Sequence, residues 1–310
     1  MLCLLFSALH LQAGLFGIHL ADRKEYVQAR ETFDQGQYEQ AVTLLTDYIY
    51  KTQNIKRREA RAYRLLGLAY EQLNNPGKAL ETYKEALEFH DKNVPLLLAA
   101  ASLYRRSDLL EQSVNLYERA LALEPKNTAA LSGLAENYIS MGFYSKAQAL
   151  YEQLSNVQPQ LSPIERARQA YTFFKQRKYE QAFVFITMAK LQEPENADFW
   201  LLSARTYKGL SMITDALAEL DIAILLAPQK NELKDTKAIW LYQAQQYNQA
   251  LALAEEILQR SPRHEPALLV KAFTLQKMGK KQTAQQILMQ IKNMQTDSFT
   301  HRVASRLLEK

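Results

Sequence analysis

Residues 128–159 read TAALSGLAENYISMGFYSKAQALYEQLSNVQP, and two residues of this stretch, Ala147 and Pro159, recur along most of the chain. The prolines are 34, 35, 34 and 34 residues apart, at Pro125, Pro159, Pro194, Pro228 and Pro262. The alanines follow nearly the same spacing, and Ser113 stands at the one position of the series where alanine is missing. These alanines are Ala41, Ala79, Ala147, Ala182, Ala216, Ala250 and Ala284. A period of this length indicates a chain built by repeating one small unit of secondary structure.

A unit of 34 residues with this alanine at its position 20 divides the chain into eight repeats. They begin at Asp22, Ala60, Val94, Thr128, Pro163, Ala197, Asn231 and Glu265. In the fourth repeat, apolar or small residues recur at i, i+3, i+4 and i+7 from Leu131 to Tyr138, and the series resumes at Ala147. This spacing predicts two amphipathic helices per repeat, here named A and B, with a short turn between them.

Glycine marks the predicted turn. Gly36, Gly142 and Gly279 occupy position 15 of their repeats, and the second repeat has Asn74 there, followed by Asn75, Pro76 and Gly77. Glycine adopts the left-handed backbone conformation in which helices commonly end. Each repeat is therefore expected to break near its middle.

At these residues the chain resembles the tetratricopeptide repeat (TPR) family. In the family pattern, helix A carries in order an aromatic residue, a leucine, a small residue that is Gly or Ala, and a tyrosine. Helix B carries in order an alanine, an aromatic residue, a second alanine and a proline. The second repeat follows this pattern through Tyr63, Leu66, Gly67, Tyr70, Ala79, Tyr83 and Ala86. The resemblance covers residues 22–296 and implies an all-α fold, a right-handed α-solenoid superhelix of about eight helix-turn-helix repeats.

Three segments follow from this frame: residues 1–21, the TPR solenoid over 22–297, and a C-terminal capping helix over 298–310. In the capping helix, Phe299, Val303 and Leu307 have the spacing i, i+4 and i+8 and are expected to face inward. Arg302, Arg306 and Glu309 are expected to face outward. Capping elements with a polar outer face are required at the ends of repeat arrays.

Two irregularities interrupt the period. Four extra residues fall within 51–59, and the connection over 158–163 contains two prolines. Each could bend the superhelix, and each could equally be a tolerated loop insertion, because lengthening a surface loop costs little free energy.

The first 20 residues do not follow the repeat pattern. An apolar run from Leu2 to Leu11 suits the core of a signal peptide, and Ala13 with Gly14 offers a cleavage point, but no Lys or Arg precedes the run. A removed export signal, a membrane anchor and an apolar first helix remain open. The sole cysteine, Cys3, lies inside the run and is misplaced for a lipoprotein signal. We expect export to the periplasm or outside, or membrane association through residues 1–20, with a cytoplasmic location as the alternative.

The sequence offers little for catalysis. His90, His264 and His301 are far apart, and no pair of histidines has metal-ligand spacing. Glycine-rich phosphate loops and nucleophile motifs are absent from the sequence, and its carboxylates are scattered over predicted solvated helix faces. We therefore interpret the chain as a non-enzyme with no catalytic residues, metal site, cofactor or small-molecule substrate.

The resemblance implies that function depends on the face that the A helices present to a concave groove, at positions 2, 5, 9, 12 and 13 of each repeat. Over the first three repeats these positions contain several arginines, of which Arg30, Arg61, Arg64 and Arg105 are candidates for binding an acidic peptide or a carboxylate. Exposed helix faces are rich in Arg for other reasons as well, so a solvated face is the alternative interpretation.

Aromatic residues fall on the same positions. Tyr26, Tyr171 and Tyr242 are joined there by Phe33, Phe174 and Phe273. An exposed aromatic side chain is a candidate anchor for a peptide, so Tyr171 and Tyr242 are named as ligand-groove residues. The alternative is that each ring packs against the neighbouring repeat.

These features predict a protein-protein interaction scaffold or adaptor. TPR proteins that bind the acidic tails of heat-shock chaperones carry Lys and Asn four residues apart in one helix A, where this chain has Tyr26 and Arg30. Bacterial envelope assembly proteins often combine an export or anchor segment with a TPR array, and the chain resembles those more closely. A cytosolic scaffold or chaperone adaptor is the alternative. The balance of 38 basic to 33 acidic residues is too even to favour nucleic acid.

The N-terminal segment generates the first testable prediction. If the apolar run is an export signal or an anchor, mature protein should begin near Gly14 or Leu15, or the full chain should remain with the membrane fraction. N-terminal sequencing and fractionation of cells distinguish these results. Recovery of full-length protein from the soluble cytoplasm would contradict both and favour the cytosolic alternative.

Overall fold

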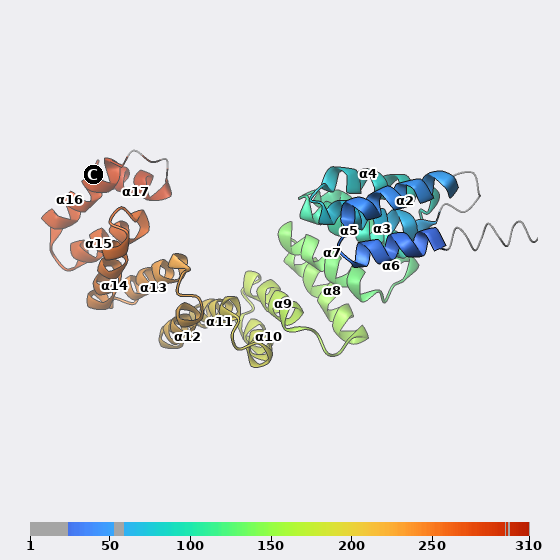
Figure 1. The fold of residues 1–310 in the computed structure, drawn as a ribbon. Helices are drawn as coiled ribbons and strands as arrows, with labels where there is room; N and C mark the ends of the chain where they lie inside the picture. Colours follow the sequence, from blue (N-terminus) through green and yellow to red (C-terminus); the bar gives the residue numbers. More distant parts are fainter. Residues whose placement is uncertain (1–23, 53–58, 295, 297, 310) are drawn as a thin grey trace, which may run out of the picture. The chain divides into compact units, whose positions relative to one another are not determined.

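The computed structural model describes residues 24–52, 59–294, 296 and 298–309 (Figure 1). All regular secondary structure in these ranges is helical. The apolar segment over 1–20 and most of the extra residues within 51–59 lie outside the described residues, so the structure does not test the expectations placed on them. None of the described helices is long and apolar enough to cross a lipid bilayer.

Residues 24–34 form helix A of the first repeat. The later helices are α2 (Tyr38–Thr52), α3 (Ala60–Gln72), α4 (Pro76–Phe89), α5 (Val94–Arg106), α6 (Leu110–Leu123), α7 (Thr128–Ser140), α8 (Tyr144–Val157), α9 (Pro163–Lys175), α10 (Tyr179–Gln192), α11 (Ala197–Gly209), α12 (Ile213–Leu226), α13 (Asn231–Gln243), α14 (Tyr247–Arg260), α15 (Glu265–Lys277), α16 (Lys281–Lys292) and α17 (Phe299–Leu308). From α3 to α15, each helix A begins at the residue where the 34-residue frame starts a repeat.

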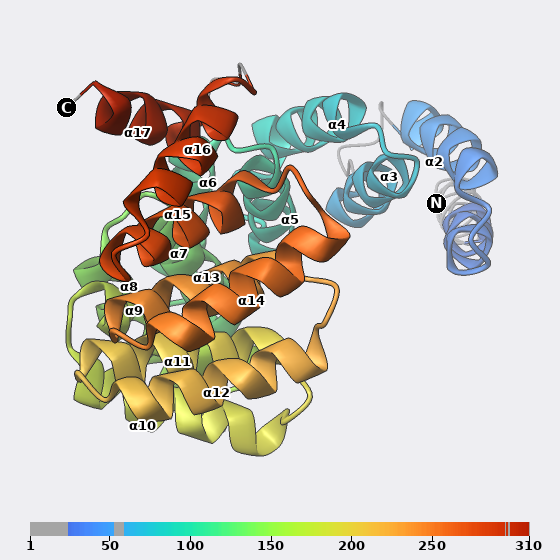
Figure 2. The ribbon, with the colours of Figure 1, turned by 90° about the vertical axis from the view of Figure 1, so that its left-hand side faces the viewer.

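The helices divide into two compact units, Met1–Gln160 and Leu161–Lys310, and the boundary falls inside the irregular connection over 158–163. Within each unit a helix packs mainly on the helices next to it in sequence, and an A helix also contacts the A helix of the next repeat, as α3 contacts α5 and α9 contacts α11. Figure 2 shows this order at the C-terminal end, where α17 lies beside α16 and α15. The prediction of an all-α solenoid is confirmed.

Close approach of helices A and B explains the recurring small residues. The side chains at position 20 are almost completely buried in every repeat, and so are those at position 8, which are Ala29, Gly67, Ala101, Ala135, Ala170, Ala204, Ala238 and Ala272. A Cβ atom added to Gly67 on α3 would lie 2.2 Å from the ring of Tyr83 on α4, the B helix of the same repeat. Between repeats, a Cβ atom added to Gly133 on α7 would lie 2.3 Å from the ring of Tyr117 on α6. The rings therefore occupy the space that a larger helix A residue would need.

Ser113, the exception in the alanine series, is explained by a buried hydrogen-bond pair. Its hydroxyl donates to the carbonyl oxygen of Ala101 at 2.7 Å and accepts from the side-chain amide of Asn137, also at 2.7 Å. Both side chains are fully buried. Because a buried amide without a partner destabilises the folded state, Asn137 on α7 requires a polar residue here.

The turn at position 15 is left-handed in all eight repeats. Gly36, Gly142 and Gly279 have φ between 77° and 82°, as their residue type predicts. The other five repeats place larger residues in the same conformation, with φ between 54° and 64°, at Asn74, Asp108, Arg177, Ser211 and Gln245. The packing of the two helices therefore imposes this conformation even where the residue type disfavours it.

Side-chain caps begin many of the helices. Asn93, Asn127 and Asn196 each accept a hydrogen bond from the first turn of the helix A that follows. Ser162 forms a capping box with Glu165 at the start of α9, the first helix of the second unit. These bonds satisfy backbone N–H groups that lack a partner within the helix.

The expected inward face of the C-terminal helix is wrong for Phe299 and Leu307, whereas Val303 is half-buried. Phe299 on α17 is 72% exposed and Leu307 is 37% exposed, whereas Ala304 is fully buried and Leu308 packs against the core of α15 and α16. The small Ala304 allows close approach, and the hydroxyl of Ser298 donates to Glu265 on α15, which holds the start of the helix in this rotation. Arg302, Arg306 and Glu309 are exposed, as expected.

The left-handed turns generate the second prediction. Gln245→Gly should raise the free energy of unfolding by about 0.5 to 1 kcal/mol, since glycine removes the steric cost of positive φ. Gly279→Ala, in the same unit, should lower it by about 1 kcal/mol, although the space around an added Cβ atom is open. Urea unfolding followed by circular dichroism measures both changes.

Ala252→Gly serves as the control, because this exposed residue lies in the interior of α14. Glycine in a helix interior should destabilise the protein. If Gln245→Gly and Ala252→Gly lowered stability equally, the proposed strain at position 15 would be refuted.

Candidate functional site

The helix A wall, defined as positions 2, 5, 9, 12 and 13 of each repeat, contains all six candidate ligand-groove residues. Arg30, Arg61, Arg64 and Arg105 lie in the first unit, on the first three A helices. Tyr171 on α9 and Tyr242 on α13 lie in the second. The candidates therefore form two separate groups, one in each unit.

Most wall arginines of the first unit have acidic partners. Arg30 pairs with Asp34 at 3.6 Å, and both side chains are more than 60% exposed. Arg61 pairs with Glu59 at 2.5 Å, and this hydrogen bond raises the pKa of Arg61 above its ordinary value. The first two repeats thus carry exposed ion pairs, which contribute little to stability and are screened by salt.

The wall arginines of the third repeat are tied into the structure more closely. Arg105 on α5 pairs with Glu136 on α7 at 2.5 Å, and these side chains are only 30% and 13% exposed. Arg106 pairs with Glu71 on α3, which also accepts a hydrogen bond of 2.7 Å from the hydroxyl of Tyr83. These contacts link successive A helices, so the two arginines have a structural role.

Arg64 differs from its neighbours on the wall. Its side chain is half-buried, and it makes no ion pair or hydrogen bond with any residue in the described ranges. It lies near the hydroxyl of Tyr83, whose pKa is raised above its ordinary value by burial first and then by the hydrogen bond to Glu71. Arg64 is therefore the wall arginine of the first unit best placed to bind an added anion.

The repeat frame predicts that Tyr26 lies on the wall, but its side chain is buried, with 9% exposed. Its ring lies 5.9 Å from that of Tyr48 on α2, and the guanidinium group of Arg61 covers it at 4.5 Å. The packing of the first two repeats therefore removes Tyr26 from the set of accessible aromatics.

The wall of the second unit carries aromatic rings on three of its four A helices, together with charged and polar residues. Tyr171 and Phe174 on α9 are half-buried, as are Tyr242 on α13 and Phe273 on α15. The ring of Tyr242 stacks on that of Phe273 at 6.1 Å and is tilted against that of Tyr247 at 5.8 Å. These rings are held in place by their neighbours while keeping an accessible edge.

Cations accompany these rings. Arg205 on α11 is exposed and has no hydrogen-bond or ion-pair partner among the described side chains. Lys208, one turn further along, donates to Gln243 at 2.6 Å, and burial lowers its pKa below the ordinary value. The second unit thus combines aromatic surface with an unpaired guanidinium group.

Comparison with protein families identifies the fold. A model described as the Psidin N-terminal TPR repeats region matches residues 30–162, and a tetratricopeptide repeat model matches residues 241–305. Both models describe the same kind of repeat, and together they cover more than half of the chain. The chain belongs to the TPR family.

Solved structures similar to this TPR chain share its fold. A tetratricopeptide repeat protein from Parabacteroides merdae is 18% identical with a TM-score of 0.61, and the match covers 82% of this chain and 98% of that one. The pilF protein of Pseudomonas aeruginosa is 19% identical with a TM-score of 0.60, covering 70% and 97%. YrrB, described as a TPR protein with an unusual peptide-binding site, is 18% identical with a TM-score of 0.53, covering 61% and 95%. At such identities the likeness shows the fold alone.

Curated relatives match over a shorter stretch. The E3 SUMO-protein ligase RanBP2 of Homo sapiens and that of Pan troglodytes are each 31% identical over 100 residues, which are 32% of this chain and 3% of theirs. The chain therefore spans a small part of the length of the curated relatives that it matches. The TPR fold itself supports protein-protein interaction in general, and TPR proteins are generally non-catalytic.

The outward face of two B helices carries a feature that the sequence argument missed. At positions 22, 26 and 29 of their repeats, α10 has Val184, Met188 and Leu191, and α12 has Ala218, Ile222 and Leu225. Leu191 is 78% exposed and Leu225 is 79% exposed. The second repeat has Glu81, Glu85 and Glu88 there. Comparing equivalent positions between repeats would have revealed this apolar surface, of a kind that often marks interaction sites.

The arginine pairs generate the third prediction. Arg105→Ala should lower the free energy of unfolding by about 2 kcal/mol, because it removes the guanidinium partner of a mostly buried carboxylate, that of Glu136. Arg30→Ala should change it by less than about 0.5 kcal/mol, since the pair with Asp34 is exposed. Urea midpoints of the two variants measure the difference. Equal changes in the two variants would mean that Arg105 contributes no more to stability than Arg30 does.

Proposed function

We propose that this protein is a non-catalytic interaction scaffold that binds a peptide segment of a partner protein along the helix A wall. The observation that carries the proposal is the set of half-buried aromatic rings on the wall of the second unit, beside the unpaired Arg205. Tyr171 and Tyr242 are the proposed anchors. Tyrosine at such a position offers a large apolar ring and a hydroxyl group while losing little conformational entropy.

The ring contacts support this role. The ring of Tyr242 contacts those of Phe273 and Tyr247, and Tyr171 packs, as Phe174 and Phe185 do, against the buried cluster that contains Ile186 and Phe199. A ring that is already ordered loses less conformational entropy when a ligand covers it. Preorganised rings spaced along one face suit a peptide that contacts several repeats in turn.

The charges of the wall indicate an acidic segment or a C-terminal carboxylate. In the second unit Arg205 is unpaired, and in the first unit Arg64 is unpaired among the described residues. Arg30 and Arg61 pair with exposed or partly exposed carboxylates, which a ligand carboxylate could replace at small cost. Arg105 is the least available of the four candidates, because its partner Glu136 is mostly buried.

We also propose export or membrane anchoring and a role in assembling the bacterial envelope. The support is the apolar run from Leu2 to Leu11, followed by Ala13 and Gly14. A scaffold held at or beyond the membrane would present its TPR wall to other envelope proteins.

The fourth prediction tests peptide binding. A random peptide library displayed on phage is selected against the full chain, and a selected peptide is synthesised and titrated by isothermal calorimetry. Tyr171→Ala or Tyr242→Ala should weaken binding by about 30-fold with little dependence on salt. For a selected peptide that binds the first unit, Arg61→Glu with Arg64→Glu should weaken binding and reduce the loss of affinity at high salt, because exposed charge pairs are screened.

Tyr50→Ala is the matched control, since Tyr50 is 73% exposed on α2 and lies off the wall. It should leave the affinity unchanged. If the selected peptides bound all three tyrosine variants and the arginine double variant as tightly as the original chain, the helix A wall would not be the binding site.

A further inference from the structure

Positive charge is concentrated at the C-terminal end of the chain. Residues 277–310 contain seven basic residues and two acidic ones, an excess of five that equals the formal net charge of the whole chain, +5. Of the 38 basic and 33 acidic residues in all, 31 of each sign therefore precede residue 277. The basic residues of the segment are Lys277, Lys280, Lys281, Lys292, Arg302, Arg306 and Lys310. An excess confined to one end favours contact with a negatively charged surface there.

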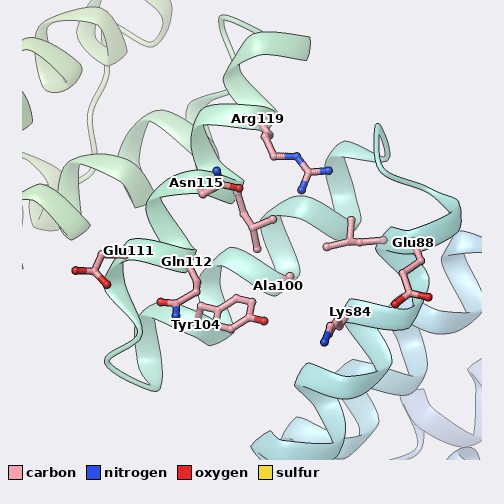
Figure 3. A pocket seen from close by; sticks show the side chains of 10 residues that line it. Lys84, Glu88, Ala100, Tyr104, Glu111, Gln112, Asn115 and Arg119 are labelled. Atoms are coloured by element: carbon pink, nitrogen blue, oxygen red, sulfur yellow. The ribbon is translucent and has the colours of Figure 1, made fainter.

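Other surfaces of the protein mix the two signs. In the first unit, Lys84 and Glu88 of α4 and Glu111 and Arg119 of α6 line one hollow together (Figure 3). At the C-terminal end, by contrast, the four lysines are exposed, and their ammonium groups make no ion pair or hydrogen bond with any residue that the structure describes. The positive charge of this end is therefore not neutralised by the fold.

Helix α17 adds an apolar stripe to the same end. On a helix with 3.6 residues per turn, Phe299, Val303 and Leu307 follow one line, and Arg302 and Arg306 lie directly beside it. Phe299 is 72% exposed, Leu307 is 37% exposed, and both arginines are exposed. The opposite side of α17 already packs on α15 and α16 (Figure 2). The stripe and its arginines are therefore available to a partner outside the fold.

Lysines lie at both ends of the helix on which α17 packs. Helix α16 begins at Lys281, directly after Lys280, and ends at Lys292. Lys277 ends α15, which α17 also contacts. Long basic side chains can rest their hydrocarbon stems on an apolar surface while the charged group stays in water. The end of the second unit thus combines an exposed aromatic ring, aliphatic surface and six exposed cations.

This combination matches the surface of a bilayer that contains anionic lipids. Apolar side chains of a surface helix enter the boundary between headgroups and acyl chains, and neighbouring cations are attracted to the headgroups. A nucleic acid would engage the cations but would leave the apolar stripe on the outer side of α17 in water. A short apolar stripe binds a membrane weakly by itself, so the surrounding lysines supply the second attraction that stable binding requires.

We propose that the C-terminal end of the second unit binds the surface of a membrane that contains anionic lipids. Phe299 and Leu307 enter the headgroup layer, Arg302 and Arg306 bind lipid phosphates, and the lysines of α15 and α16 add attraction. The contact is separate from the helix A wall and does not depend on the apolar run from Leu2 to Leu11. It would hold the TPR array at a membrane through its last helix.

Vesicle sedimentation tests this contact with the full chain. Vesicles contain either phosphatidylcholine alone or equal amounts of phosphatidylcholine and phosphatidylglycerol. The anionic lipid should raise binding at least about tenfold, and added salt should reverse the gain, because screening weakens the attraction of the cations. Insertion of the apolar N-terminal run would instead give binding to both kinds of vesicle. Equal binding to both kinds would overturn the proposal.

Substitutions on α17 locate the contact. Arg302→Gln with Arg306→Gln should lower binding to the anionic vesicles about 25-fold, because each basic residue near such a surface contributes a factor of about five. Phe299→Gln should lower it about tenfold without changing the salt dependence, because it removes only apolar surface. Full binding by the arginine variant would contradict the proposal. Full binding by Phe299→Gln would indicate a contact with any polyanion and would also overturn it.

Matched controls remove the same groups from the first unit. Lys78→Gln with Lys84→Gln takes two exposed cations from α4, and Phe89→Gln takes a ring that is 50% exposed from the end of the same helix. Both controls should leave vesicle binding unchanged. If they lowered binding as much as the α17 variants do, the attraction would belong to the whole chain and the proposed site would be wrong. Circular dichroism of every variant should show unchanged helix content.

Discussion

The close approach of helices A and B within each repeat is the constraint on which the rest of this structure depends. Positions 8 and 20 carry Gly, Ala or Ser and are almost completely buried in every repeat. A Cβ atom on Gly67 would overlap the ring of Tyr83, which shows how little space remains between the helices. Larger side chains would separate the two helices and open voids around the rings that now fill the core.

The same constraint explains features that lie away from the contact itself. Because helix B must return against helix A, the residue between them takes a left-handed conformation even where it is Arg177 or Gln245. Because Ser113 replaces alanine at this contact, its hydroxyl can bind Asn137 of the next repeat. Local strain and a buried polar pair are thus tolerated where the packing of successive helices compensates for them.

The surfaces left over by this packing have different chemistry. On the helix A wall of the first unit, Arg105 and Arg106 mainly join successive helices, whereas Arg64 remains unpaired among the described residues. The wall of the second unit presents ordered aromatic rings beside Arg205. The walls of the two units therefore differ in charge and in aromatic content.

The sequence by itself determined the all-α solenoid, its eight-repeat frame and the starting residues of the A helices from α3 to α15, because the 34-residue period and its small residues reflect local packing that recurs in each repeat. The tertiary structure alone decided which surface residues already have partners. The repeat frame predicts that Tyr26 and Arg105 lie on the wall, but Tyr26 packs against the ring of Tyr48 on α2 and Arg105 pairs with Glu136 on α7. The frame also predicts that Phe299 faces inward, but the buried Ala304 faces the core of α15 and α16 instead. Such contacts depend on side chains brought together by folding, and no periodicity in one helix encodes them.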